Sequence, residues 1–146
     1  MKKPRIYLSG PIYGTTENQQ KWRQIIAKKL FNHYEIIDPL RRDYRGTKFN
    51  AANSCSIVKA DLSDIDHSQV LLANCDNPGW GTAMEIFYAH MKGKPVCFIT
   101  SNKNPSPWLL AHARNLKTID IAVRELKKFR KTILHCLGYN IRAEFK

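Results

Sequence analysis

The sequence lacks several patterns, and each absence excludes a class of protein. No run of about eighteen apolar residues occurs, and the first residues lead into a strand-like segment instead of a signal peptide, so we expect a cytoplasmic protein without a membrane span. The four cysteines form no CxxC pair and the five histidines no HExxH motif, which argues against zinc and disulfide frameworks. No GxGxxG follows the first predicted strand, which disfavours a dinucleotide-binding oxidoreductase.

Acidic residues are scarce relative to basic ones. The chain has 24 Lys and Arg against 12 Asp and Glu, a net charge of +12 that attracts anions such as phosphorylated ligands or nucleic acid. One basic cluster follows the second predicted strand and is either an exposed basic loop or the edge of a site: Arg41, Arg42, Arg45 and Lys48. The other is interpreted as a solvated helix face and tail: Lys127, Lys128, Arg130, Lys131, Arg142 and Lys146.

Hydrophobic segments of strand and helix type alternate along the chain. With 146 residues, 43% of them hydrophobic, the sequence predicts one domain over 1–146, with a basic C-terminal helix and tail from about residue 121. The predicted strands are 5–9, 34–38, 70–73, 95–99 and 116–119, and the predicted helices are 17–31, 55–65, 81–92, 108–114 and 121–137. This alternation indicates an α/β fold of the flavodoxin-like, Rossmann-like kind, a doubly wound five-stranded parallel sheet with helices on both faces.

Polar residues stand at the carboxyl ends of the predicted strands, where such folds bind their ligands. Ser9 and Gly10 end the first strand, Asp38 ends the second, and residues 74–81 and 100–104 follow the third and fourth. We expect these segments to converge on one crevice with Glu85 at its rim.

Glu85 is the leading candidate for a nucleophile. A flexible turn that includes Gly81 precedes it, and the positive end of a helix would keep its carboxylate ionised. The alternative is a capping box, in which Thr82 caps the helix and Glu85 bonds back to the cap.

A series of short motifs resembles the nucleoside 2-deoxyribosyltransferase family, which includes nucleoside 5′-monophosphate N-glycosidases. The motifs are Ile6-Tyr7-Leu8-Ser9-Gly10-Pro11-Ile12, Asp38-Pro39, Asp61-Leu62 with Ile65, Leu72-Ala73-Asn74, Gly81-Thr82-Ala83-Met84-Glu85-Ile86 with Ala89, Gly93-Lys94-Pro95-Val96 and Trp108-Leu109. The resemblance spans roughly residues 5 to 115. Where the family usually has an Asp after Ser, this sequence has Gln69.

The resemblance implies a retaining double displacement at the anomeric carbon. Glu85 matches the nucleophile and Tyr7 the tyrosine that orients it, although a buried strand tyrosine with a hydrogen-bonded hydroxyl would look the same. Asp61 matches the aspartate that contacts the base and assists its proton transfer. Independently of the family, cleavage of an N-glycosidic bond needs one carboxylate to trap C1′ and one acid for the departing base.

The resemblance also implies a substrate-binding role for two further residues and self-association. Asp76 is near the position of a ribose-binding aspartate, and Asn104 is near the amide that a neighbouring subunit contributes. We therefore expect a homo-oligomer with a shared active site, helped by an apolar patch at residues 108–110. No cofactor or metal is expected.

Three functions follow from these residues. The first is base exchange between a 2′-deoxynucleoside and a free nucleobase. The second is hydrolysis of a nucleoside 5′-monophosphate, whose phosphate would be bound by Ser9 and the basic cluster Arg41, Arg42, Arg45 and Lys48. The third, a non-catalytic nucleotide- or nucleic-acid-binding domain, is not favoured because few aromatic residues accompany the basic ones, namely Tyr44, Phe49, Phe129, Tyr139 and Phe145.

Overall fold

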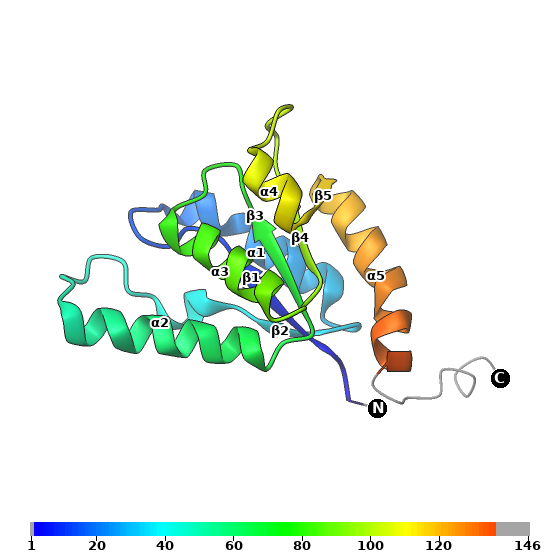
Figure 1. The fold of residues 1–146 in the computed structure, drawn as a ribbon, viewed down its shortest axis with the longest axis horizontal. Helices are drawn as coiled ribbons and strands as arrows, with labels where there is room; N and C mark the ends of the chain where they lie inside the picture. Colours follow the sequence, from blue (N-terminus) through cyan, green and yellow to red (C-terminus); the bar gives the residue numbers. More distant parts are fainter. Residues whose placement is uncertain (1, 137–146) are drawn as a thin grey trace.

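A computed structural model describes residues 2–136 of the chain (Figure 1). Its five strands form one parallel sheet in the order β2-β1-β3-β4-β5. The strands are β1 (Arg5–Ser9), β2 (Glu35–Ile37), β3 (Val70–Asn74), β4 (Val96–Ile99) and β5 (Arg114–Lys117). The helices are α1 (Glu17–Leu30), the 3₁₀ helix η1 (Pro39–Arg42), α2 (Ala51–Asp66), α3 (Trp80–Met91), α4 (Pro107–His112) and α5 (Ile119–Cys136). The predicted fold class is confirmed.

Alternating side chains of each strand pack on opposite faces of the sheet, as the pleat requires. In β1, Ile6 and Leu8 join the core beneath α1 and α5, whereas Tyr7 joins the core beneath α2 and α3. Figure 1 shows α3 in front of the sheet and α1 behind it. The central strand β3 contributes Leu72 to one core and Leu71 to the other, so its apolar run is buried on both faces as predicted.

Several element boundaries differ from the prediction. Helix α2 begins at Ala51, four residues early, because Asn50 and Asn53 form a capping box in the segment predicted as loop. Strand β5 is Arg114–Lys117 instead of 116–119, and α5 correspondingly starts at Ile119. Polar Arg114 and Asn115 carry little strand signal on their own, so pairing with β4 decides their structure.

Some sequence predictions lie outside the described residues. These concern Leu137, Tyr139, Arg142, Phe145 and Lys146. Within residues 2–136, no helix combines the length and apolar character that a membrane span requires.

Candidate active site

Glu85 is held by two hydroxyl groups from β1. Because Tyr7 and Ser9 are two residues apart in a strand, both point to the α3 face of the sheet. The Tyr7 hydroxyl donates to Glu85 Oε1 at 2.8 Å, and Ser9 Oγ donates to Oε2 at 2.5 Å. Burial raises the pKa of Tyr7, as does the neighbouring Glu85 carboxylate, so the phenol stays neutral and serves as a donor. Both oxygens of Glu85 are therefore fixed in direction.

The capping alternative for Glu85 is wrong. Helix α3 begins at Trp80 with Gly79 as its N-cap, and no side chain caps it. Glu85 thus lies in the second turn and its side chain turns inward to β1, while the Thr82 hydroxyl is buried without a hydrogen-bond partner.

The expectation that the helix terminus keeps Glu85 ionised is also wrong. Burial raises the pKa of Glu85 to about 7, and the hydrogen bonds from Ser9 and Tyr7 only partly offset it. The helix macrodipole acts mainly on the first turn of a helix, and Glu85 lies in the second turn of α3. Its carboxyl group is therefore divided between protonated and ionised forms near neutral pH.

This raised pKa predicts a stability loss as pH rises. Between pH 4.5 and about 7, Glu85 is mostly protonated in the folded protein and mostly ionised in the unfolded chain. The free energy of unfolding is therefore highest at the acidic end of this range and falls as the pH rises through it. Between pH 5 and pH 8 the wild type should lose about 2–3 kcal/mol of unfolding free energy that Glu85→Gln does not lose, because glutamine does not titrate. Urea unfolding of both proteins at the two pH values measures this change, and a pH-independent difference would contradict the raised pKa.

Asp61 faces the same cavity from α2 and is bound by a cation. Arg42 Nη2, from η1, donates to Asp61 Oδ1 at 2.6 Å and to Asp64 Oδ2 at 2.7 Å. Arg41 Nη2 contacts both oxygens of Asp64, at 2.8 and 2.7 Å. Burial raises the pKa of Asp61, and the Arg42 hydrogen bond and charge oppose that rise. The site therefore contains two carboxyl groups with raised proton affinity.

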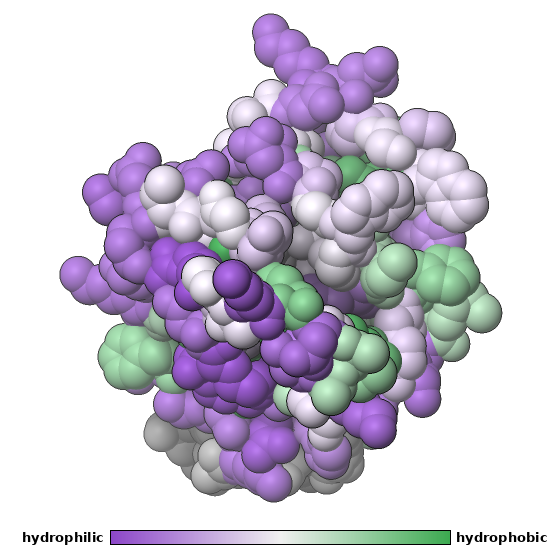
Figure 2. All heavy atoms as spheres, turned by 90° about the vertical axis from the view of Figure 1, so that its left-hand side faces the viewer, coloured by the Kyte–Doolittle hydropathy of each residue, from purple (hydrophilic) through white to green (hydrophobic). Residues whose placement is uncertain are grey.

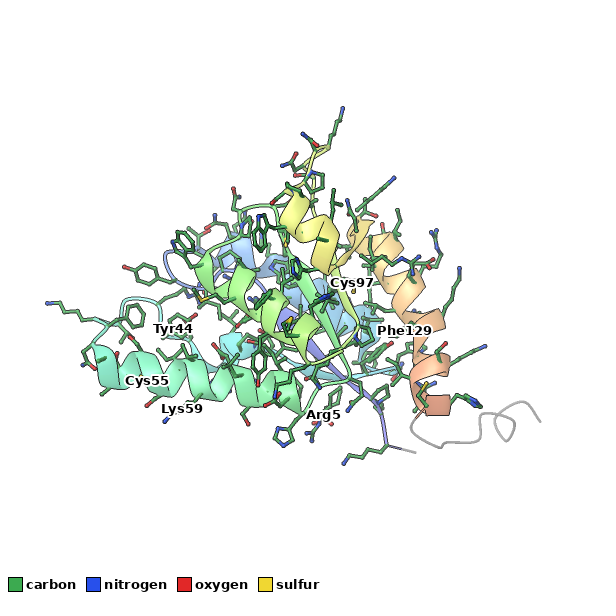
Figure 3. The ribbon with its side chains drawn as sticks, viewed as in Figure 1. Arg5, Tyr44, Cys55, Lys59, Cys97 and Phe129 are labelled. Carbon is green, nitrogen blue, oxygen red and sulfur yellow. The ribbon has the colours of Figure 1, made fainter. Side chains whose placement is uncertain are left out.

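A cavity of about 560 Å³ joins these groups. Its lining includes the polar residues Asp61, Thr82 and Glu85. The rest of the lining comes from residues 10–13 after β1, from α2, and from the turn containing Gly79 and Gly81. In Figure 3, Tyr44 lies on the side of α2 that faces α3, in agreement with its place in the lining. A lining that combines a few polar groups with many apolar side chains suits a ligand that has both polar and apolar parts.

The sequence did not predict that three aromatic residues form a cluster at the cavity. Tyr13 and Phe49 meet edge to face with ring centroids 5.3 Å apart, and Tyr44 contacts Phe49 at 5.8 Å. All three line the cavity, and Tyr13 is 66% exposed. The signal available was an aromatic residue directly after the Gly10-Pro11-Ile12 turn. Figure 2 shows this side of the molecule as mostly hydrophilic, with apolar side chains gathered in a few separate places.

The structure brings Tyr7, Ser9, Asp61 and Glu85 together, with Gly10 and Gly81 in the cavity lining. Gly10 also packs closely against Trp22. A Cβ at this position would lie only 2.9 Å from the indole ring, so a larger residue would clash. The glycine therefore permits close packing of β1 on α1.

Asp38 and Asp76, two of the predicted substrate-binding residues, lie outside this cavity lining and have other partners. Asp38 caps η1 through Leu40 N and accepts from the buried Arg23, whose guanidinium also binds the carbonyls of Leu8 and Gly10. Asp76 accepts from the backbone and hydroxyl of Ser101 in a separate polar hollow at the ends of β3, β4 and β5.

The remaining predictions concern Asn104 and Arg41. Asn104 is exposed in the turn after β4, and its backbone N–H donates to Asn102. Arg41 is ion-paired with Asp64, and it does not line the cavity. Among residues 2–136, no cluster of three or more His, Cys, Asp or Glu is arranged to bind a metal ion.

Comparison with known proteins decides the family. The family model for nucleoside 2-deoxyribosyltransferase matches residues 6–135. The chain belongs to this family. The family recognised from the sequence motifs is thereby confirmed. No curated protein matches the sequence significantly.

Solved structures share the nucleoside deoxyribosyltransferase fold. A 2-deoxyribosyltransferase from Bacillus psychrosaccharolyticus matches with a TM-score of 0.66 and 18% identity, over 82% of this chain and 90% of that one. A conserved protein from Enterococcus faecalis V583 matches with a TM-score of 0.69 and 19% identity, over 86% and 98%. A CMP N-glycosidase from Clostridium botulinum matches with a TM-score of 0.55 and 18% identity, over 86% and 98%. At these identities the likeness supports the fold.

Proposed function

We propose that this protein exchanges the base of 2′-deoxynucleosides through a covalent glycosyl-enzyme. The observation that carries the proposal is the Glu85 carboxylate, fixed by Tyr7 and Ser9 in a cavity that Asp61 also lines. Cleavage of an N-glycosidic bond requires a nucleophile and an acid close to each other. Glu85, whose two carboxylate oxygens are oriented by hydrogen bonds, supplies the first, and Asp61 in the same cavity supplies the second.

In the first step, ionised Glu85 attacks C1′ and the bond from C1′ to the base nitrogen breaks. Protonated Asp61 donates its proton to the departing base, which leaves neutral. In the second step an acceptor base attacks C1′, the ester to Glu85 breaks, and Asp61 takes the proton that the acceptor loses. The pKa of Glu85, raised to about 7, leaves both of its protonation states populated near neutral pH, and burial shifts the pKa of Asp61 upward, toward the protonated form that the first step uses.

A second candidate is hydrolysis of a nucleoside 5′-monophosphate, in which water replaces the acceptor base. The excess of basic residues favours it, because a net charge of +12 attracts phosphorylated substrates and Lys48 is exposed in the loop after η1. The similarity in fold to a CMP N-glycosidase is consistent with this candidate.

Self-association and a shared active site remain part of the proposal. Large apolar side chains are exposed along α3 and α4, including Trp80 at 86% and Trp108 at 73%. The exposed members are Trp80, Met84, Phe87, Met91, Trp108 and Leu110. A second copy of the chain is the partner that this apolar surface suits.

A chromatographic assay of released base tests the function. The substrates are deoxynucleosides and their 5′-monophosphates, each with and without a second free base. We expect base exchange that depends on the acceptor. Release from monophosphates without an acceptor would establish the hydrolase instead, and no release from any substrate would favour a non-catalytic binding domain.

A further inference from the structure

Arg42 joins the candidate site to an acidic pair on α2. Its Nη2 nitrogen donates to Asp61 at 2.6 Å and to Asp64 at 2.7 Å, and its side chain is 33% exposed. Asp61 and Asp64 are three residues apart in α2, so they lie on the same side of the helix. One guanidinium nitrogen is thus shared by a carboxylate that lines the cavity and a carboxylate that does not.

We propose that Arg42 is a positioning residue that orients the Asp61 carboxylate and controls when it takes a proton. Asp64 is the second anchor, which keeps the guanidinium in place when Asp61 is neutral. The inference rests on the proposed function, because control of the Asp61 proton matters for catalysis only if Asp61 exchanges that proton with the base.

The electrostatic surroundings support this role. Burial raises the pKa of Asp61, and Arg42 provides the largest opposing effect through a hydrogen bond and its charge. Asp61 also interacts electrostatically with groups from four elements and a loop, which are Arg41 in η1, Asp64 in α2, Tyr7 in β1, Glu85 in α3 and Tyr44 after η1. Arg42 is the only cation among the described residues that forms an ion pair with Asp61.

The same contacts make a phosphate-binding role for these arginines less favourable. Arg41 and Arg42 both donate to Asp64, and Arg42 also donates to Asp61, so a phosphate would have to compete with ion pairs already formed. A neighbouring arginine with a similar ion pair but no contact to Asp61 provides a matched control. Arg41 is that residue.

The test is the titration of Asp61 in ligand-free protein. Carboxyl ¹³C chemical shifts, with Asp61 assigned through Asp61→Asn, would be followed against pH in the wild type, Arg42→Gln and Arg41→Gln. We expect Arg42→Gln to raise the pKa of Asp61 by about 1 unit or more, since opposite charges at this range shift a carboxyl by roughly 1–3 units. Arg41→Gln should change it by only a few tenths of a unit, and Arg42→Lys should restore part of the shift.

Activity provides the second measurement. The pH dependence of base release should move in the same direction as the Asp61 titration in Arg42→Gln, and remain nearly unchanged in Arg41→Gln. An unchanged Asp61 titration in both glutamine variants, or equal shifts in the two, would overturn the inference. So would an increase of KM for monophosphates alone in both variants, which would indicate a phosphate site.

The two proposals fail separately. If the wild type releases no base from any substrate, the proposed function fails, while the Asp61 titration still measures the effect of Arg42. If Arg42→Gln does not fold, as judged by circular dichroism, Arg42→Met replaces it in the titration. Methionine keeps an unbranched side chain without the charge or the hydrogen-bond donors, and an Asp61 titration identical to the wild type would overturn the inference.

Discussion

Replacing Glu85 with Gln should abolish base release while leaving the fold intact. The amide keeps the size of the side chain but cannot form the glycosyl ester, and loss of a nucleophile costs roughly 10⁴-fold or more in turnover. The fold should persist because Glu85 makes no helix cap and its burial disfavours the charged form. Single-turnover base release, together with thermal unfolding, measures both parts of the expectation.

An exposed glutamate provides the control for this variant. Glu35 on β2 is ion-paired with Arg5 at the surface, and Glu35→Gln should retain activity within about twofold, because exposed ion pairs contribute little. If Glu85→Gln kept a tenth or more of wild-type turnover, Glu85 would not be the nucleophile.

Replacing Asp61 with Asn should slow base release by roughly 10²–10⁴-fold, the usual contribution of a general acid. The loss should depend on the leaving group. A natural base needs a proton as it departs, whereas a p-nitrophenyl 2-deoxyriboside has a leaving group stable as an anion and should react with the variant at close to the wild-type rate. Comparing the two substrates separates proton transfer from binding.

Asp64→Asn serves as the matched control on the same helix. Asp64 contacts both arginines without lining the cavity, so this variant should change the leaving-group dependence much less than Asp61→Asn. If Asp61→Asn slowed the natural and the p-nitrophenyl substrates equally, Asp61 would position the substrate instead of supplying a proton.

Local sequence pattern predicted the parts of the site that depend on strand periodicity. Tyr7 and Ser9 are separated by one buried leucine, and the pleat sends both toward α3. The order of strands and helices also indicated that the segment carrying Glu85 follows the central strand β3. Alternation and element order are encoded within short segments, so they can be derived before any side-chain contact is known.

Contacts between distant segments could not be derived in this way. Nothing in the sequence around Arg42 indicates that it meets Asp61, because the contact depends on how η1 packs against α2. Asp38 provides a second example, since its partner Arg23 reaches it from the interior of α1. The raised pKa of Glu85 depends likewise on burial beneath α3, which a helix-terminus argument does not include.

Trapping the glycosyl-enzyme tests the central claim most directly. A 2′-deoxy-2′-fluoro nucleoside slows both steps by destabilising the oxocarbenium-like transition state, so the intermediate can accumulate. Intact-mass and peptide mass spectrometry of the wild type should show one added fluorodeoxyribosyl group on the peptide that contains Glu85, and none in Glu85→Gln. Base release without an adduct, or an adduct on another residue, would contradict Glu85 as the nucleophile.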